Sequence, residues 1–308
     1  RLKKNMTVEQ AFGYIRKYGV DKETIYTCYV MDEKRRLEGV VTVKDLLMND
    51  YAALMGDIMD PHVIKAYTTE DQEKVVETFN EYNLLSLPVV DGEDRLVGII
   101  TVDDVMDVME QEATEDFEKM AAMAPSEKPY LKTGVFSLAR HRIVWLLVLM
   151  ISGMITGGIL GRYEAAIAAM PLLVTFIPML TDTGGNAGSQ SSTMIIRGMA
   201  VGEIEAGDIL RVLWKELRVG VIVGVLLGLV NYIQLVIRFP GQEMLCLTVV
   251  LSLLATVMLA KTIGCVLPIA AQVLHLDPAI MAAPLITTIV DAVSLIIYFQ
   301  LACSLLKI

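Results

Sequence analysis

Hydrophobic residues are distributed in two different ways along this chain of 308 residues. Up to about residue 130, short apolar runs alternate with amphipathic segments whose apolar residues recur at helical spacing. Beyond that point the apolar runs lengthen to the roughly 20 residues that cross a hydrocarbon core as a helix. The pattern therefore predicts a soluble α/β module followed by an all-α transmembrane domain.

The first part of the chain contains an internal repeat. Residues 28–47 and 87–106 each read as an apolar strand, an acidic turn, a second apolar strand and a Thr-x-x-Asp sequence that opens a helix. The threonine hydroxyl can cap that helix, and the aspartate suits the positive end of its dipole. Amphipathic helices are predicted ahead of the two hairpins, at about 7–18 and 71–83. One repetition of this unit indicates two small α/β units packed as a pair.

These hairpins resemble those of a tandem CBS-domain pair, a cytosolic module that commonly senses adenosine nucleotides or ions and regulates an attached enzyme or transporter. In such modules the Thr-x-x-Asp turn often meets a ribose. The resemblance implies an adenine nucleotide such as ATP near Lys44 and Asp45, or near Thr101 and Asp104. The alternative is that the turn only caps a helix.

The second part of the chain offers five apolar segments long enough to span a lipid bilayer. Most Lys and Arg residues near the ends of these segments would share one side of the membrane. The positive-inside rule then predicts a multi-pass plasma-membrane protein with its N-terminal module in the cytoplasm and, after five crossings, its C-terminus outside. The predicted helices lie at about 142–161, 165–196, 212–237, 244–273 and 278–306.

Two carboxylates stand alone in otherwise uncharged membrane segments. Asp182 is the only charged residue within 165–196, and Asp291 is the only one within 278–306. An ionisable group at this depth is costly and normally faces a polar interior or a water-filled path. Both carboxylates are therefore predicted to line an ion path.

Each carboxylate belongs to a polar stripe at helical spacing. Pro171, Pro178 and the Gly184-Gly185 pair share a segment with Asp182, and they predict a helix that bends or opens and turns backbone carbonyls toward a cavity. Carboxylates, carbonyls and retained water are ligands that Mg²⁺ accepts. The alternative for the amides, hydroxyls and glycines is helix packing and interhelical hydrogen bonding. The first stripe comprises Asp182, Gly185, Asn186, Ser189 and Thr193, and the second comprises Thr287, Asp291, Ser294 and Tyr298.

Acidic residues dominate the first part of the chain. Residues 1–130 hold 27 Asp and Glu against 15 Lys and Arg, within a net charge of −10 for the whole chain. Eight of these carboxylates and no basic residue fall within residues 103–118. A solvated helix face is one interpretation, but so many like charges repel unless cations collect, which favours a divalent-cation sensor. The four scattered cysteines show neither a zinc nor a disulfide pattern.

The sequence PMLTDTGGNAGSQSSTMIIRGMAVGEI at 178–204, followed by PLITTIVDAVSLIIYF at 284–299, resembles the MgtE family of bacterial magnesium channels. The acidic TVDDVMDVMEQEATED at 101–116 belongs to the same resemblance. It covers essentially the whole chain, without the family's usual N-terminal helical domain. Two positions depart from the family pattern: Asp182, where a small residue is expected, and Asn83, where an acidic one is expected.

The resemblance implies a homodimer whose pore is lined by the second and fifth membrane helices of both subunits, with Asp291 at the principal Mg²⁺ site. It also implies that cytosolic Mg²⁺ bridges acidic residues of the CBS pair and of a connecting plug helix and so holds the pore shut. The matching regulatory positions are Asp71, Glu73, Asp104, Asp107, Glu112, Glu115 and Asp116.

The predicted function is Mg²⁺-selective uptake under negative feedback by cytosolic Mg²⁺. One alternative is a transporter of another divalent cation, such as Co²⁺, Mn²⁺ or Ca²⁺. A CBS-regulated membrane enzyme is disfavoured because no His-Glu-x-x-His sequence is present. The expected partners are a second copy and the lipid bilayer, with no nucleic acid. The predicted domains are a first CBS domain at 1–55, truncated at its start, a second at 56–108, an acidic plug helix at 109–132 and a five-helix transmembrane domain at 133–308.

Overall fold

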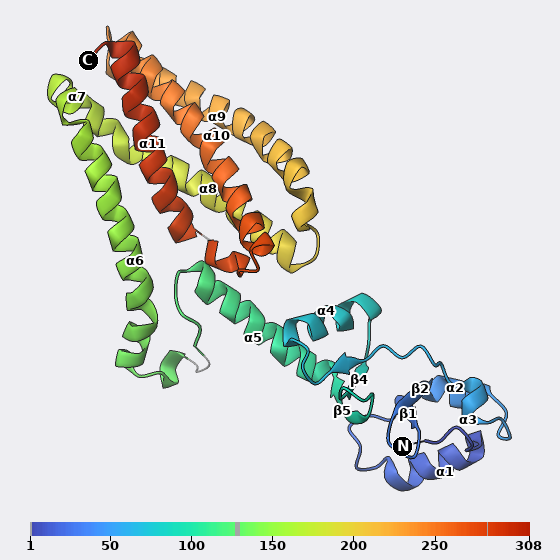
Figure 1. Cartoon of the computed structure of the whole chain (residues 1–308). Helices are drawn as coiled ribbons and strands as arrows, with labels where there is room; N and C mark the ends of the chain where they lie inside the picture. Colours follow the sequence, from blue (N-terminus) through green and yellow to red (C-terminus); the bar gives the residue numbers. More distant parts are fainter. Residues whose placement is uncertain (1, 127–129, 282) are drawn as a thin grey trace. The chain divides into compact units, whose positions relative to one another are not determined.

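The computed structural model describes residues 2–126, 130–281 and 283–308 and divides into two compact units, Arg1–Ala113 and Thr114–Ile308 (Figure 1). The first unit mixes helices with strands, and the second contains helices and no strand among its described residues. Residues 127–129, inside the predicted plug segment, lie outside the described residues. The α/β and all-α division predicted from the hydrophobic pattern is confirmed.

The first unit holds two copies of one architecture. The first copy contains α1 (Val8–Tyr18), the antiparallel hairpin of β1 (Thr27–Met31) and β2 (Leu37–Thr42), α2 (Val43–Met48) and α3 (Met55–Ile58). The second contains β3 (Ala66–Tyr67), α4 (Gln72–Tyr82), the hairpin of β4 (Ser86–Val90) and β5 (Leu96–Thr101), and α5 (Val102–Met120). In each hairpin the register shifts one residue before the turn, at Val30/Met31 and at Val89/Val90. The internal repeat is therefore structural as well as sequential.

Hydrogen bonds join the two copies at their hairpins. The backbone N–H of Leu37 donates to Asp94, and that of Leu96 donates to Arg35. The buried hydroxyls of Tyr29 and Ser86 lie 3.1 Å apart. These contacts pack the copies as the pair that the repeat predicts.

The predicted helix cap at Thr42 forms. Thr42 accepts a hydrogen bond from the N–H of Asp45, and Asp45 Oδ2 accepts from the N–H and hydroxyl of Thr42. This reciprocal arrangement satisfies donors that the first turn of a helix leaves free. Asn83 ends α4 in the left-handed conformation (φ 50°), which asparagine tolerates better than most residues.

The second unit contains five helices of more than 20 residues among its described residues. Short helical segments lie before and between them: η1 (Tyr130–Lys132), α7 (Glu164–Ala169), η2 (Pro171–Phe176), η3 (Ala206–Asp208) and η4 (Pro278–Met281). The long helices are α6 (Val135–Arg162), α8 (Ile177–Ala200), α9 (Ile209–Arg238), α10 (Glu243–Val273) and α11 (Ala283–Leu306). Four of them, all but α8, are long and apolar enough to cross a membrane.

The second predicted membrane helix, 165–196, is wrong as a single helix. The chain instead forms α7, breaks at Met170 and passes through η2 before α8 begins. Pro171 causes the break because it has no N–H to donate and disfavours helical backbone at the residue before it. The later proline, Pro178, is accommodated in the first turn of α8.

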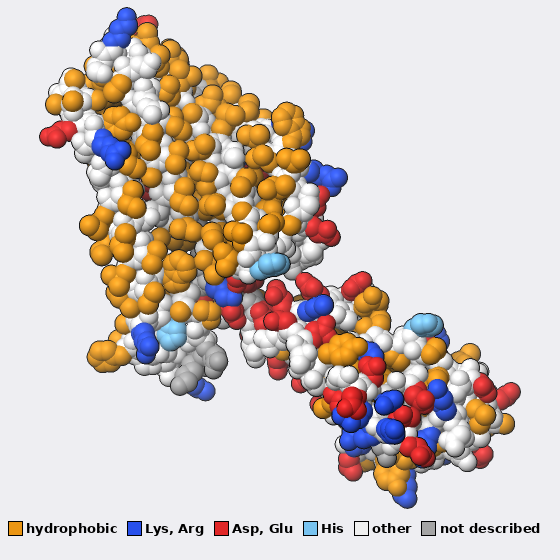
Figure 2. All heavy atoms as spheres, in the orientation of Figure 1, with side chains coloured by type: hydrophobic (Ala, Val, Ile, Leu, Met, Phe, Trp, Pro, Cys, Tyr) orange, Lys and Arg blue, Asp and Glu red, His pale blue; other side chains and the backbone are white. Residues whose placement is uncertain are grey.

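Helix α10 forms the centre of the bundle and packs against α8, α9 and α11. Its core includes Val257 and Ala260, which cluster with Leu180 of α8 and Val290 of α11. Hydrophobic side chains also cover much of the face of this unit seen in Figure 2, and many large apolar side chains of its helices are exposed, as a lipid-facing surface requires. The bundle is thus apolar both inside and out, so its polar residues stand out.

Candidate cation pathway

The glycines of α8 bring neighbouring helices close to its backbone. A Cβ added to Gly184 would lie 2.5 Å from Thr256 Cγ2, and one added to Gly185 would lie 3.0 Å from Thr287 Cγ2. These glycines are therefore contact points with α10 and α11. The predicted opening of the helix at Gly184-Gly185 is wrong, because α8 continues through both residues to Ala200.

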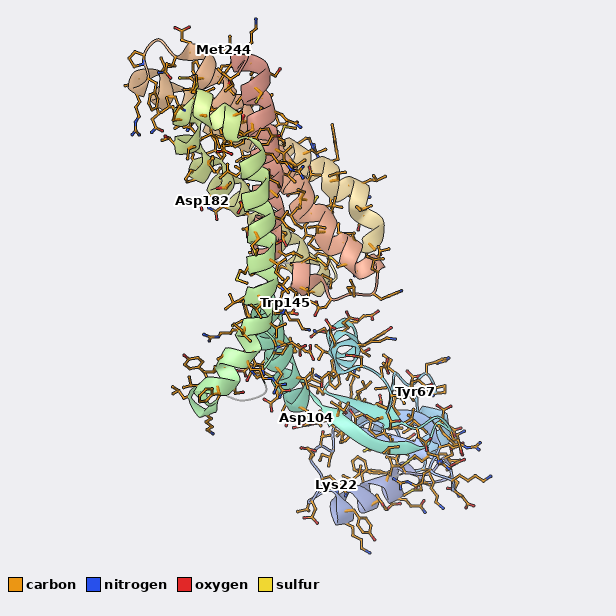
Figure 3. The ribbon with its side chains drawn as sticks, turned by 60° about the vertical axis from the view of Figure 1, so that its left-hand side comes forward. Lys22, Tyr67, Asp104, Trp145, Asp182 and Met244 are labelled. Atoms are coloured by element: carbon orange, nitrogen blue, oxygen red, sulfur yellow. The ribbon has the colours of Figure 1, made fainter. Side chains whose placement is uncertain are left out.

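A cavity of about 600 Å³ lies between α8 and α11. It receives Asp182, Gly185 and Asn186 from α8 and Asp291 from α11. Asp182 is labelled in Figure 3. Two carboxylates that are more than 100 residues apart in sequence therefore line one space. The remaining lining residues are Pro178, Met179, Thr181 and Thr287.

The cavity presents oxygen ligands and, among its eight described lining residues, no basic side chain. The hydroxyl of Thr181 donates to the carbonyl of Ile177, and that of Thr287 donates to the carbonyl of Pro284. Each hydroxyl proton is thus bound within its own helix. A site with two carboxylates, an amide and no compensating cation attracts hard cations such as Mg²⁺ or Ca²⁺, and its described lining offers no thiolate or imidazole to a softer metal.

The other two members of the first stripe lie outside this lining. The hydroxyl of Ser189 donates to the carbonyl of Gly185, at 2.8 Å, and Thr193 is exposed one turn further along α8. The predicted stripe is therefore brought into the cavity at Asp182, Gly185 and Asn186 only.

The second stripe also divides. Thr287 and Asp291 line the cavity, whereas Ser294 and Tyr298 are buried in the bundle. Tyr298 donates a hydrogen bond to the carbonyl of Leu173 and so ties α11 to η2. The prediction that this whole stripe forms a pore wall is wrong in its second half, where α11 turns toward the packed core.

The predicted regulatory carboxylates divide between the two units. In the first unit, Asp71 caps α4 by accepting a hydrogen bond from the N–H of Glu73, and Gln72 donates to Glu112 at 2.6 Å. Asp104, labelled at the start of α5 in Figure 3, accepts from the hydroxyl of Thr101. Asp107 is exposed in the same helix. Within the described residues, His, Cys, Asp and Glu side chains form no group of three or more positioned to hold a metal.

The last turn of α5 carries a basic residue, Lys119, directly after the acidic run 103–118. Lys119 Nζ lies 2.5 Å from Glu115 Oε1 and 2.5 Å from Asp277 Oδ2, in the turn before η4. Partial burial alone would lower the pKa of Lys119, but hydrogen bonds to the two carboxylates outweigh it and raise that pKa. Asp116 belongs to the same part of α5 in the second unit.

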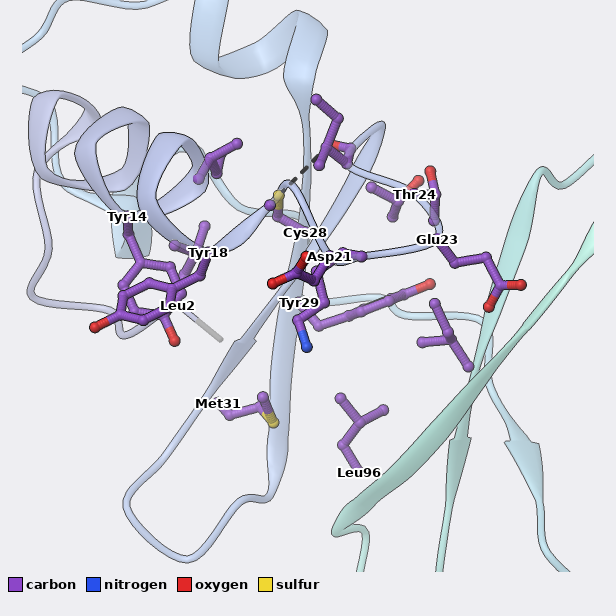
Figure 4. A pocket seen from close by; sticks show the side chains of 16 residues that line it. Leu2, Tyr14, Tyr18, Asp21, Glu23, Thr24, Cys28, Tyr29, Met31 and Leu96 are labelled. Atoms are coloured by element: carbon purple, nitrogen blue, oxygen red, sulfur yellow. Dashed lines mark hydrogen bonds between the residues drawn. The ribbon is translucent and has the colours of Figure 1, made fainter.

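The first unit contains a separate cavity of about 410 Å³ (Figure 4). Asp21, Lys22 and Thr24 line it together with Tyr29, and Leu96 and Ile99 reach it from the second hairpin. Lys44 and Asp45 are not among its lining residues. Asp45 serves the helix cap described above, so the nucleotide assignment at these two positions stays a prediction.

Comparison with known proteins gives the second unit a family. Residues 177–301 match the MgtE divalent cation transporter family, and residues 2–50 and 55–111 match the CBS domain. The magnesium transporter MgtE of Thermus thermophilus is 39% identical over 306 residues, which are 99% of this chain and 68% of that protein. This chain belongs to the MgtE family. The membership confirms the prediction of a membrane transporter rather than an enzyme, with a tandem CBS module.

Other MgtE relatives agree. The magnesium transporter MgtE of Bacillus subtilis is 35% identical over 296 residues, covering 96% of this chain and 65% of that protein. The chain thus spans about two thirds of the length of these relatives. A solved structure, the cytosolic domain of the Mg²⁺ channel MgtE in complex with ATP, is 47% identical with a TM-score of 0.34, covering 35% of this chain and 43% of that one.

Proposed function

We propose that this protein carries Mg²⁺ across a membrane through the cavity between α8 and α11. The observation that supports this most directly is the meeting of Asp182 and Asp291 in one space with the Asn186 amide. Placing a carboxylate within a membrane helix costs free energy, and such residues usually mark a path for ions or protons. Family membership indicates which ion is carried, since the relatives are named magnesium transporters.

The cavity suits an ion that keeps part of its water shell. Mg²⁺ dehydrates reluctantly and is usually held by one or two carboxylates together with several waters. A space of about 600 Å³ is large enough for such a hydrated ion. Asp182 then supplies charge beside Asp291, although the resemblance alone led us to expect a small residue at that position.

The pore is proposed to form in a homodimer. Asp182 and Asn186 are exposed in the single chain, whereas Gly184, Gly185, Ala187 and Gly188 between and beside them are buried. A second copy facing this side of α8 would enclose the ion path and double its carboxylates. The N-terminal module is proposed to lie in the cytoplasm and the C-terminus outside.

Regulation is proposed to act through the acidic residues of the CBS pair and α5. Residues 103–118 contain eight carboxylates and no basic residue, so bound Mg²⁺ would relieve their mutual repulsion. Cytosolic Mg²⁺ closes the pore only if it binds the closed arrangement more tightly than the open one. An adenine nucleotide such as ATP stays a predicted ligand of the CBS module.

The test of transport is Mg²⁺ flux into vesicles that contain the purified protein. Asp291→Asn should lower the flux by about tenfold or more, because it removes a negative charge from the ion path while keeping a side chain of the same size. Asp208→Asn is the matched control, since this carboxylate pairs with Arg211 outside the cavity. Flux that Asp291→Asn leaves undiminished would refute the pore assignment. Competition by Ca²⁺, Mn²⁺ and Co²⁺ in the same assay decides between Mg²⁺ and the other divalent cations.

The test of regulation uses the same vesicles with the CBS side exposed to increasing Mg²⁺. Neutralising Glu112, Glu115 and Asp116 together, as Gln, Gln and Asn, should leave the flux less inhibited. Replacing Glu9, Glu23 and Glu33 by Gln removes as much charge from the first CBS copy and serves as the control. Inhibition that stays unchanged in the first variant rejects the sensor.

A further inference from the structure

A lysine lies inside the helix bundle. Lys261 is 5% exposed and sits in α10, 18 residues after its first residue and 12 before its last. A buried charge is retained only when other groups compensate it. The cavity between α8 and α11 does not include this residue.

Two partners from two other helices surround the ammonium group. Lys261 Nζ donates to Ser191 Oγ of α8 at 3.1 Å and lies 3.5 Å from Glu216 Oε2 of α9. The hydroxyl of Ser191 in turn donates to Glu216 Oε2 at 2.6 Å. The side chains of Lys261 and Glu216 are only 7% and 16% exposed. One hydroxyl thus bridges a buried ion pair, and the cluster joins three membrane helices.

Glycines hold the three helices close at this level. A Cβ on Gly264 would lie 2.3 Å from the carbonyl oxygen of Gly188, so the backbones of α10 and α8 are in contact one turn from Lys261. A Cβ on Gly220 would lie 3.5 Å from Lys261 Cδ, which places the lysine stem against α9. The ion pair therefore forms where the helices have the least freedom to separate.

The cluster contacts the face of α8 opposite to the ion path. Ser191 follows Asp182 by nine residues and Asn186 by five. At about 100° per residue, Ser191 points roughly 180° away from Asp182 and 140° away from Asn186. Apolar packing alone would tolerate a small rotation of α8, whereas a directional hydrogen bond to a buried ion pair does not.

We propose that Lys261, Glu216 and Ser191 are positioning residues that fix the rotation of α8, so that Asp182 and Asn186 face the ion path. This inference rests on the proposed function, in which that cavity carries the ion. None of the three residues lines the cavity, so they act through α8 rather than by touching the ion. Loss of either charge leaves the other buried without its partner. Loss of both charges leaves no unpaired buried charge, but it also removes the ion pair that fixes the rotation of α8.

The test compares Glu216→Gln, Lys261→Met and their combination with Ser252→Ala. Ser252 is the control because it is equally buried in α10 and its hydroxyl donates within its own helix, to Thr248. Mg²⁺ flux into vesicles is measured over a range of Mg²⁺ concentrations. Each single variant should lose about tenfold or more of its maximal flux. The double variant should recover most of that flux yet need several-fold more Mg²⁺ for half-maximal flux, because its charges are balanced but α8 is no longer fixed.

A second measurement reports position independently of flux. Asn186→Cys, in a chain whose native cysteines are replaced, is labelled with a charged thiol reagent, and Lys261→Met together with Glu216→Gln should slow that labelling several-fold. A double variant with wild-type flux, wild-type half-maximal concentration and wild-type labelling would overturn the inference. Absence of Mg²⁺ flux from the unmodified protein would instead reject the proposed function, and the labelling would still test the clamp.

Discussion

Among the glycines of the bundle, Gly264 has the least room for an added Cβ. A Cβ there would lie 2.3 Å from the carbonyl oxygen of Gly188, a distance that real Cβ atoms do not reach. For Gly264→Ala, α8 and α10 must move apart by about 0.7 Å to bring that contact from 2.3 Å to 3.0 Å. The obstacle is backbone, so no side-chain rotation relieves it.

The cost follows from overpacking. Adding a group to a packed core costs about 1–3 kcal/mol, and a backbone obstacle places this case at the upper end. Replacing a helical glycine by alanine returns about 1 kcal/mol through helix propensity. The net destabilisation expected for Gly264→Ala is therefore about 2 kcal/mol. The same shift moves α8 relative to α10, so Mg²⁺ flux should fall as well.

The assay is the temperature at which detergent-solubilised protein stops eluting as a monodisperse peak. Gly153→Ala is the matched control, since a Cβ on this glycine of α6 meets nothing within 4 Å. That variant should be as stable as the wild type or slightly more stable. If Gly264→Ala melts at the wild-type temperature, the close contact between α8 and α10 is not real and the reasoning fails.

Two other contacts yield predictions. Lys119→Met removes the ion pairs with Glu115 and Asp277 and should cost about 1 kcal/mol, since the pairs are partly exposed. The pKa of Lys119 is raised in the fold, so this stabilisation is present below the ordinary lysine pKa of about 10.4 and is lost only above it. The difference in melting temperature between Lys119→Met and the wild type should therefore stay constant between about pH 6 and pH 9. A difference that shrinks within this range contradicts the prediction. Tyr29→Phe leaves the buried Ser86 hydroxyl without this partner and should cost about 1 kcal/mol, seen as a lower urea midpoint for the CBS module, whereas an unchanged midpoint would show that the bond adds no stability.

Local sequence patterns were sufficient for the CBS module. Its hairpins, its Thr-x-x-Asp caps and the helices that precede them depend on alternation, turn residues and capping, all of which act within a few positions. Pro171 likewise indicated a bend or opening in the second predicted membrane helix. The prolines and glycines predicted a bend or opening without its position. The chain breaks at Met170, and α8 continues through Gly184-Gly185, where neighbouring helices pack against both glycines.

The candidate site was predictable in part. Asp182 and Asp291 stood out because an isolated charge in an apolar segment is costly, and both line the cavity. Ser189 and Thr193 share their helical spacing but not their place in the cavity, because spacing gives a face of a helix and not the extent of the space beside it. Lys261 carried a sequence signal too, as a lone charge within 244–273, but its partners could not be read from the chain.

By itself, the sequence determined where the chain changes from water-soluble to membrane-embedded and which unit repeats. It also determined which carboxylates lie alone in apolar segments, where their free-energy cost indicates a functional role. Each of these depends on the hydrophobicity and charge of residues near one another in the chain. Only the tertiary structure decided that Asp182 and Asp291 line one cavity, that Tyr298 is buried in the core, and that Ser191 bridges Glu216 and Lys261. Such pairings depend on how far each helix is rotated and shifted against its neighbours, and interhelical packing, not local sequence, sets that rotation.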